Sequence, residues 1–369
     1  MTQTLAARLA EYAGIAADLG VGAVALVPGA NFTRALGQAF ASHERPFLLV
    51  ITADGRTAAL VPNLELQSWN LLGFAGQVFD WRDQDGYDTA FAGLIAHLGI
   101  RSLAVEGQVM RVFVHHALRK AQPGLEIIDG EAAISGLRVI KTPDEIAAMK
   151  AAIGISERAL ERVLAGVRLG QTEKDIEQSL ILALFAEGSE AHAFAPIVAA
   201  GDNSALPHAK ARADYHVKAG DALLLDFGAT KHGFAADITR TVFLGHASDE
   251  GRRVYDTVLR ANRKGHEITR PGITAHEIDD AVTGVLEASD FADRIRTRTG
   301  HGLGRSTHEA PYIIRGNHTP LLTGTVFTNE PGLYQEGNFG VRIEDDILIT
   351  DKGCISLTSY PTELQVLKC

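Results

Sequence analysis

The chain has 369 residues, of which 46% are hydrophobic and 22% are charged, and its formal net charge at pH 7 is −10. This length allows two domains, and this composition is ordinary for a globular protein with an apolar core. The negative charge and the lack of a Lys/Arg cluster disfavour nucleic acids and anionic membranes as partners. We therefore expect a small molecule or a peptide as the substrate.

The N-terminal residues and the cysteines bear on the compartment. Glu11 and Asp18 lie in an amphipathic helical pattern that lacks the basic start and apolar centre of a signal peptide. No apolar run is long enough to cross a membrane. Cys354 and Cys369 are the only cysteines, so we expect no disulfide framework. The sequence predicts a cytoplasmic protein.

Two domains are expected, residues 1–133 and 134–369. The first alternates helical patterns with short apolar runs, which is typical of a small α/β domain. The runs predicted as strands are 23–27, 47–51, 58–61 and 103–105. A short strand is expected over 138–140, just after the boundary.

A long helix is expected to begin after this boundary, in the sequence Thr142-Pro143-Asp144-Glu145. Thr142 can serve as the N-cap, Pro143 suits the first helical position, and Glu145 can complete a capping box.

The second domain contains two similar halves. Residues 170–177 resemble 272–279, and the order Gly220, Asp226, Gly228 recurs as Gly324, Glu330, Gly332. Chance similarity between short segments is the alternative, which the shared order of the two matches disfavours. We expect an internal pseudo-twofold repeat in which each half supplies a hairpin to one central site.

Four carboxylates and one imidazole stand in apolar or glycine-rich segments of this domain. They are Asp226 in GDALLLDFG, Asp237 in GFAADITRT, His301 in GHGLG, Glu330 in TNEPG and Glu344 in RIED. Isolated buried carboxylates are too costly without compensating charge. We therefore expect these residues to bind metal ions.

Hairpin geometry supports this expectation. A two-residue turn at Lys231 and His232 would place Asp226 opposite Asp237, and a three-residue loop over 336–338 would place Glu330 opposite Glu344. Facing like charges destabilise a sheet unless a cation lies between them. The alternative is a pair of solvated hairpins, which the apolar residues of these strands disfavour.

An oxygen-rich set of ligands suits a hard divalent ion such as Mn²⁺. The number of ligands predicts two ions, and two neighbouring ions are typical of metal-assisted hydrolysis. His208 in NSALPHA and His308 in STHEAPY are candidates for holding a carbonyl group or moving a proton.

The segments DFG, DITRT, GHGLG, NEPG and RIEDD together form a pattern that resembles the metallopeptidase family of prolidase, aminopeptidase P and, more distantly, methionine aminopeptidase. The resemblance covers nearly the whole chain. It implies an α/β (α+β) protein with a small creatinase-type N-terminal domain and a pita-bread catalytic domain that contains the pseudo-twofold repeat. It also implies a homodimer.

The resemblance assigns roles to the five ligands. Carried over residue by residue, it implies that Asp226 binds one ion, that His301 and Glu330 bind the other, and that Asp237 and Glu344 bridge them. The ions expected are Mn²⁺, with Co²⁺ or Zn²⁺ as alternatives.

The resemblance also implies roles for residues around the ligands. Glu330 takes the proton of the attacking nucleophile, and His208 and His308 assist at the carbonyl group and the proline side of the substrate. Arg342 does not bind the metal itself but orients one of the metal ligands.

Two departures from the family pattern concern the substrate. Thr297 stands where relatives often have a histidine. Tyr312 stands where some prolidases have an arginine that grips the carboxylate of a dipeptide, and Arg315 is a candidate substitute for that arginine.

The resemblance points to hydrolysis of Xaa-Pro bonds. Proline has a fixed φ and no backbone N–H, so such bonds need a dedicated peptidase. The short N-terminal domain favours an Xaa-Pro dipeptidase (prolidase). The alternatives are an Xaa-Pro aminopeptidase that acts on longer peptides and a catalytically silent binding protein on the same fold. Creatinase shares the architecture but lacks this metal set.

Overall fold

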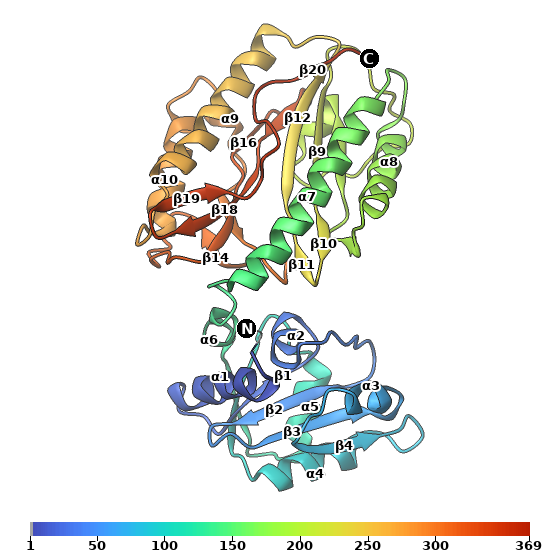
Figure 1. Ribbon diagram of the computed structural model, residues 1–369, viewed down its shortest axis with the longest axis vertical. Coiled ribbons are helices and arrows are strands. Elements are labelled where there is room, and N and C mark those ends of the chain that lie inside the picture. The colour runs from blue at the N-terminus through green and yellow to red at the C-terminus, as the bar shows by residue number, and fades with distance from the viewer. Residues whose placement is uncertain (1–2) are drawn as a thin grey trace. The chain divides into compact units, whose positions relative to one another are not determined.

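The computed structural model describes residues 3–369 and divides between Arg138 and Val139 into two compact units, which we treat separately. Both units combine helices with β-sheets (Figure 1). Among the described helices, none is both long and apolar enough to cross a bilayer.

The first unit is built on a six-stranded mixed sheet of order β4-β3-β2-β1-β5-β6. The strands are β1 (Ala23–Leu26), β2 (Leu48–Thr52), β3 (Thr57–Pro62), β4 (Gln77–Trp81), β5 (Ser102–Val105) and β6 (Glu126–Asp129). The helices are α1 (Leu5–Asp18), α2 (Ala30–Leu36), α3 (Leu66–Asn70), α4 (Asp88–Leu98), α5 (Val112–Ala121) and α6 (Glu131–Gly136). The four predicted strands are confirmed as β1, β2, β3 and β5.

Both faces of this sheet are buried, which explains why its strands read as unbroken apolar runs. Ala23 and Ala25 of β1 pack in a core with α4 and α5. Val24 and Leu26, which point to the opposite face, pack in a second core with α1, α2 and α3.

The chain between the two units differs from the prediction. Helix α6 occupies the stretch where the sequence places the domain boundary, and residues 137–139 form a turn. The strand predicted over 138–140 is therefore wrong, and only Ile140 makes a bridge, to Thr325. Because α7 (Pro143–Gly166) begins so soon afterwards, no room remains for a ladder. Its capping box, with Thr142 as N-cap and Glu145 at the third position, is present as predicted.

The second unit contains four-stranded and five-stranded sheets, of orders β20-β12-β9-β8 and β14-β13-β15-β18-β19. Its other helices are α8 (Glu173–Ala186), α9 (Asp249–Ile268) and α10 (Ala275–Glu287). Strands of the first sheet are β8 (Ile197–Ala200), β9 (Ala222–Phe227), β12 (Ile238–Leu244) and β20 (Val366–Leu367). Strands of the second sheet are β13 (Gly300–Gly302), β14 (Glu309–Ile313), β15 (Val326–Asn329), β18 (Asp345–Thr350) and β19 (Gly353–Ser356).

Shorter elements complete the unit. They are β7 (Ala191–His192), β10 (Ala229–Lys231), β11 (Phe234–Ala235), β16 (Gly332–Tyr334) and β17 (Gly340–Arg342). Single 3₁₀ turns are η1 (Asn63–Glu65) in the first unit, and η2 (Gly201–Ala205) and η3 (Ala292–Arg294) here.

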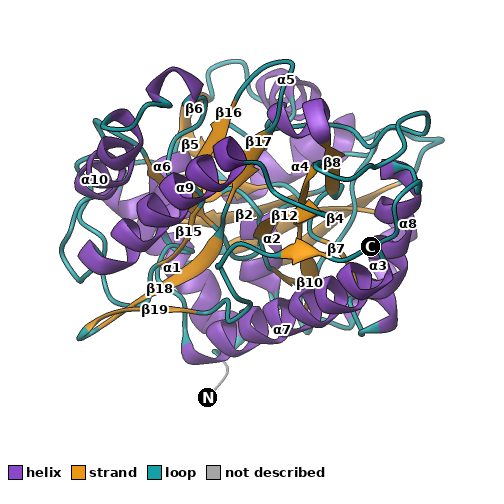
Figure 2. Cartoon of the chain, turned by 90° about the horizontal axis from the view of Figure 1, so that it is seen from above, coloured by secondary structure: helices purple, strands orange, loops and turns teal. Residues whose placement is uncertain are grey.

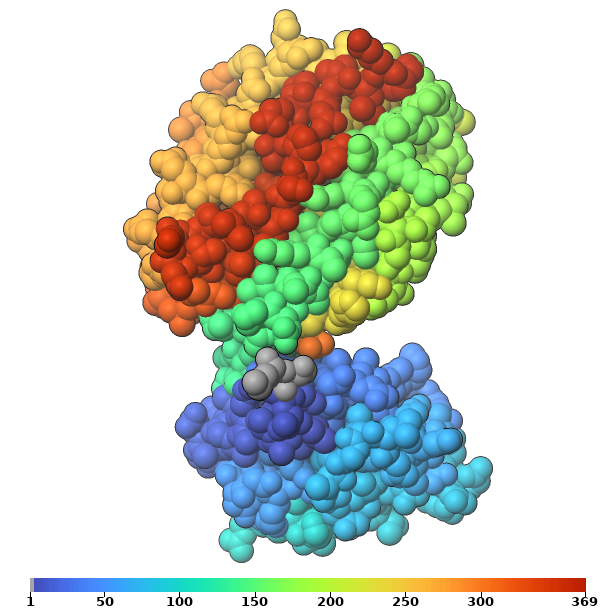
Figure 3. Space-filling view, in the orientation of Figure 1, coloured from blue at the N-terminus to red at the C-terminus, as the bar shows by residue number. Residues whose placement is uncertain are grey.

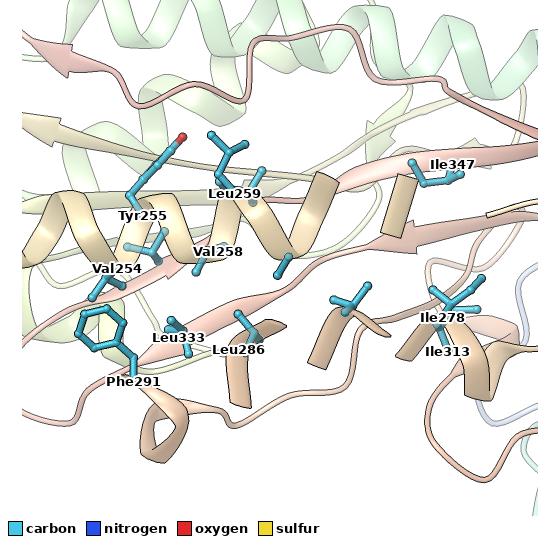
Figure 4. Close-up of a cluster of buried hydrophobic side chains, with 14 of the residues drawn as sticks. Val254, Tyr255, Val258, Leu259, Ile278, Leu286, Phe291, Ile313, Leu333 and Ile347 are labelled. Atoms are coloured by element: carbon cyan, nitrogen blue, oxygen red, sulfur yellow. The ribbon is translucent and has the colours of Figure 1, made fainter. Parts of the chain in front are cut away.

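Helices α7 and α8 pack mainly against the first sheet, and α9 and α10 mainly against the second. Apolar residues of α7 and α8 pack against β8, β9 and β12. Val254 and Val258 of α9 and Ile278 of α10 pack against the second sheet, where Ile347 belongs to β18 (Figure 4). Helices α7, α8 and α10 lie at the outside of the view in Figure 2, with strands between them.

Matching features recur in the two halves of this unit, in agreement with the predicted repeat. Thr172 begins α8 with a capping box, and Thr274 begins α10 in the same way. Gly220 before β9 has a φ of 93°, and Gly324 before β15 has a φ of 89°. Each half thus supplies two helices and a strand that is entered through a left-handed glycine.

The C-terminal residues fasten the two helical layers together. They run over the surface between α7 and α9, shown in red in Figure 3. The Tyr360 amide donates to Glu157 of α7 at 2.7 Å, and the Tyr255 hydroxyl of α9 donates to the Thr362 carbonyl at 2.9 Å.

His266 joins the end of α9 to the second sheet. Its Nε2 lies 3.4 Å from an Asp345 carboxylate oxygen, and the Asp345 side chain is buried. Burial disfavours the imidazolium, but hydrogen bonds with the Asp345 and Cys354 side chains outweigh burial and raise the pKa of His266 to about 9. At neutral pH, His266 therefore forms a charged bridge to Asp345.

This bridge predicts a pH-dependent stability. Because the folded pKa of His266 is about 9 and the ordinary value is 6.5, its stabilisation is fully present below pH 6.5 and lost as the pH rises through 9. We expect His266→Gln to lower the free energy of unfolding by about 1–3 kcal/mol at pH 6. Urea unfolding from pH 6 to 9.5 measures this difference, which should shrink toward the alkaline end. The exposed His43→Gln variant is the control, and a pH-independent difference for His266→Gln would contradict the prediction.

Candidate metal centre and active site

The five predicted metal ligands line one cavity of about 630 Å³ in the second unit. Asp226 lies on β9, Asp237 directly before β12, His301 on β13, Glu330 directly after β15, and Glu344 between β17 and β18. They come from both halves of the unit, which therefore meet at this cavity.

Their ligand atoms form two overlapping clusters, each with its atoms within 4.8 Å of one another, and Asp237 and His301 form a third such cluster with His308. One cluster contains Asp226, Asp237 and Glu344, and the other contains His301, Glu330 and Glu344. Because Glu344 belongs to both, its carboxylate lies where it can contact two neighbouring ions. Asp237 lies near the second cluster too, with Oδ2 3.8 Å from the His301 Nε2.

The first predicted hairpin register is wrong by two residues. Asp226 pairs with Thr239, and Thr230 pairs with Ala235. The turn residues are His232 and Gly233, both at positive φ, because a two-residue hairpin turn of this kind needs left-handed backbone at both positions. A shift of two keeps every side chain on the same face, so Asp237 remains a diagonal neighbour of Asp226.

The second predicted register is confirmed. Tyr334 pairs with Gly340, and the Gln335 amide donates to the Phe339 carbonyl across the loop. The same register holds between β15 and β18, where Asn329 pairs with Asp345. Paired residues therefore lie on both sides of Glu330 and Glu344. Their register places Glu330 opposite Glu344.

The carboxylates destabilise one another in the absence of a cation. Burial and the charges of Glu344 and Asp226 hold the pKa of Asp237 well above its usual value. Burial and the charges of Glu330 and Asp226 likewise raise the pKa of Glu344. Burial also raises the pKa of Asp226, although Arg342 opposes this effect.

Glu330 differs from the other acids. Burial favours its neutral form, but the hydrogen bond to His301 at 3.2 Å, the charges of His301 and Arg342 and a hydrogen bond with Thr328 together outweigh burial and lower the pKa of Glu330. Its side chain is 17% exposed, more than those of His301 and Asp237, at 4% and 5%. Glu330 is therefore an ionised carboxylate that water can reach.

Arg342 lies behind the acids. Its guanidinium donates to Asp226, to the Tyr334 hydroxyl at 2.7 Å and to the Thr239 hydroxyl at 3.0 Å. Thr239 in turn donates to Glu344. One buried arginine thus contacts a carboxylate of one hairpin directly and, through Thr239, a carboxylate of the other.

The two additional histidines reach the same cavity. His308 lies beside His301, with ring centroids 3.9 Å apart. Burial and the charge of His301 lower the pKa of His308 to about 4, so its ring is neutral at pH 7. His208 is exposed and lines the cavity from the loop after η2. Glu173 anchors that loop, because its carboxylate accepts from Asn203 and Arg212.

The two predicted substrate residues are not where the sequence placed them. Arg315 lies outside the cavity, and its guanidinium donates to Asp280 at 2.9 Å and to Glu287 at 2.6 and 2.9 Å. The suggestion that it binds substrate is therefore wrong for this structure, because two surface carboxylates already hold it. Tyr312 pairs with His301 in the sheet, and its ring lies 4.7 Å from the Arg298 guanidinium carbon.

Several cavity residues were missed in the sequence. Phe194, Ile197 and Pro207 form apolar lining, and Arg298 and Thr307 form polar lining beside Thr297. Arg298 is the one with a sequence signal, because it stands three residues before His301 in RTGHG. The apolar lining carries no signal, since similar residues fill the core.

Comparison with protein families decides the identity. Residues 147–351 match metallopeptidase family M24, and residues 8–140 match the creatinase/prolidase N-terminal domain. The chain belongs to metallopeptidase family M24. The predicted family, the creatinase-type N-terminal domain and the metallopeptidase class are thereby confirmed.

Individual relatives match this M24 peptidase along its whole length. It is 32% identical over 369 residues to the probable dipeptidase PepE of Mycobacterium tuberculosis, covering 99% of this chain and 97% of that protein. The solved prolidase from Thermococcus sibiricus superposes with a TM-score of 0.94 at 32% identity, with 100% of both chains covered. The X-Pro aminopeptidase from Thermotoga maritima superposes with a TM-score of 0.83 at 30% identity, covering 96% of this chain and 98% of that one. These matches confirm the predicted α/β fold.

The repulsion among the acids predicts how a metal changes stability. We expect Mn²⁺ to raise the melting temperature of the M24 peptidase. At a free Mn²⁺ concentration of 100 times the Kd, each occupied site adds about 2.7 kcal/mol to the free energy of unfolding. Glu344→Gln should lose much of this response, because Glu344 belongs to both ligand clusters. In EDTA the same variant should be at least as stable as the wild type, because one buried charge has been removed.

Thermal melts with EDTA and with increasing Mn²⁺ measure both effects. Glu336→Gln, in the exposed loop of the second hairpin, is the matched control. An equal Mn²⁺ response in Glu344→Gln and the wild type would contradict the prediction.

Proposed function

We propose that this M24 peptidase binds two divalent ions and hydrolyses the Xaa-Pro bond of dipeptides. The observation that carries the proposal is the convergence of four carboxylates and His301 from both halves of the unit on one cavity. The names of its relatives support the substrate, because they include a prolidase and a probable dipeptidase.

The residues present fit the two ions. The set offers oxygen and imidazole ligands, and Asp226 Oδ1 is buried without a hydrogen-bond partner among the described residues. A cation would satisfy that oxygen and offset the repulsion that raises the pKa of Asp237 and Glu344. Asp226 would hold one ion, His301 and Glu330 the other, and Asp237 and Glu344 both.

Mn²⁺ is our choice of ion, with Co²⁺ or Zn²⁺ as alternatives, because four of the five ligands are hard carboxylates. When bound, such ions lower the pKa of water and offset the negative charge that develops on a substrate carbonyl oxygen.

The surrounding residues have complementary roles in this proposal. Glu330 is ionised and accessible to water, so it can accept the proton of the attacking water. His308, neutral at pH 7, can hydrogen-bond to the carbonyl oxygen without bringing a charge. His208 can contact the proline side from its loop. Arg342 keeps Asp226 and, through Thr239, Glu344 in position.

Activity on longer Xaa-Pro peptides is the second candidate, and the similarity to the X-Pro aminopeptidase from Thermotoga maritima favours it. A cavity of about 630 Å³ is large enough for a dipeptide and does not by itself exclude an extended substrate. The names of the relatives, a prolidase and a probable dipeptidase, favour dipeptides as the first choice.

We also propose a homodimer in the cytoplasm. The family resemblance supports the dimer, and the two free cysteines support a reducing compartment. Light scattering on the purified protein tests the dimer, and a monomer at micromolar concentration would rule it out.

Hydrolysis itself is tested on purified protein supplied with Mn²⁺. We expect cleavage of Xaa-Pro dipeptides, slower cleavage of Xaa-Pro-Yaa tripeptides, and no cleavage of Xaa-Ala. Release of the N-terminal residue, followed by chromatography, measures all three rates. Faster tripeptide cleavage would favour the aminopeptidase, and no cleavage of any Xaa-Pro substrate by metal-loaded protein would refute the proposal.

The proposed role of His308 predicts a catalytic defect. We expect His308→Asn to lower kcat by about 10²- to 10⁴-fold, the usual contribution of a positioned proton donor or acceptor. Metal content should remain close to two ions for each chain, because His308 is outside the five ligands. Elemental analysis of the same sample separates the two effects. A loss of metal that matches the loss of activity would show His308 to be a ligand instead.

A further inference from the structure

We infer that Arg298 binds the free carboxylate of the substrate and so makes the site selective for dipeptides. This inference rests on the proposed function and names the group that recognises the end of its substrate. It assigns a role to a residue that lies in the cavity wall but is outside the metal centre.

Arg298 is placed to meet a substrate held at the metal centre. It lies three residues before His301, and its side chain lines the cavity together with Thr297, Thr307 and His308. A ligand whose carbonyl group lies near His301 and His308 would extend along this wall.

The charge of Arg298 is not paired with an acid in the described part of the chain. Its one hydrogen bond within that part is from Nε to the Gly300 carbonyl at 3.1 Å. Arg342, the other arginine among the described residues that line the cavity, is already engaged by Asp226. The two Nη groups of Arg298 therefore remain for a partner, and they match the two oxygens of a carboxylate.

Two features hold Arg298 in place before any substrate arrives. The guanidinium lies over the ring of Tyr312, 4.7 Å from its centroid, in a cation–π contact. The backbone beside it is fixed because the Thr299 amide donates to the buried Asp279 at 2.9 Å. Such preorganisation reduces the entropy lost on binding. Tyr312 thus acts as a platform beneath the arginine.

The rest of the cavity explains why this cation would select by length. Phe194, Ile197 and Pro207 give the cavity an apolar stretch, which suits a proline ring or an apolar Xaa side chain and offers no charge. In a tripeptide the carboxylate lies one residue further along, about 3.3–3.6 Å of extended chain beyond the position it has in a dipeptide. A fixed guanidinium would then face a neutral amide.

The test compares an Xaa-Pro dipeptide with the corresponding Xaa-Pro amide, which has the same shape but lacks the negative charge. Wild type, Arg298→Gln and Arg298→Lys are assayed with Mn²⁺, and Arg296→Gln is the matched control. Arg296 is an exposed arginine outside the cavity, whose guanidinium donates to the Asp293 and Ile295 carbonyls.

We expect Arg298→Gln to lower kcat/KM for the dipeptide by roughly 10- to 150-fold, mainly through KM, as expected for a lost hydrogen bond to a charged group. The amide should change less than about threefold, since it offers no carboxylate. Arg298→Lys should lie between the two, because it keeps the charge but not the forked geometry. Arg296→Gln should match the wild type on both substrates.

An equal loss on dipeptide and amide, or no loss on either, would overturn the inference, since both results would show that Arg298 does not read the carboxylate. Metal content and melting temperature of each variant identify a folding or metal defect. Calorimetric titration with the two ligands measures the same charge preference without turnover. If the wild type hydrolyses neither substrate, the proposed function fails, and the calorimetric comparison of wild type with Arg298→Gln still decides the role of Arg298.

Discussion

The central constraint on this protein is that its second unit buries several carboxylates around one cavity with little internal compensation. Arg342 donates to Asp226, but its guanidinium is also committed to two hydroxyl groups. Burial and mutual repulsion raise the pKa of Asp237 and Glu344, so the ionised acids lower the stability of the folded unit. The apolar strands around them stabilise the unit against that effect.

The duplicated architecture makes this arrangement possible. Each half packs two helices against strands that carry the acids, so apolar residues next to the acids in the chain, such as Leu225, Phe227 and Ile343, belong to the cores that stabilise the unit. Rigid strands then fix the carboxylates from both sides, and the C-terminal segment fastens α7 to α9 through Tyr360 and Thr362. In the proposed metal centre, each ligand lies on a strand or within two residues of one, and so is positioned by the ladders beside it.

The sequence predicted those parts of the structure that depend on local patterns. Thr142 and Glu145 form the predicted capping box because helix starts obey short-range rules. The loop over 336–338 set the correct register for Glu330. The predicted register of the hairpin after Asp226 is shifted by two residues. The prediction places the turn at Lys231 and His232, although Gly233 is the residue suited to positive φ.

What the sequence could not predict was which side chains meet across the cavity. Arg315 is close to Tyr312 in the chain, yet it follows the end of β14 and donates to Asp280 and Glu287 at the surface. Arg298, further away in sequence, reaches Tyr312 because β13 pairs with β14. Contacts across strands depend on register and twist, and no short motif encodes them.

The pairing of β13 with β14 also links the chemistry to its selectivity. The two strands bring His301, Tyr312 and the preceding Arg298 together, so the ladder that positions a proposed metal ligand also positions the aromatic ring beneath Arg298. A change in the register of β14 would therefore alter the metal centre and the recognition of the substrate's end at once. Separating the two would require a change confined to the Arg298 side chain, which contacts the ladder only through Gly300 and the Tyr312 ring.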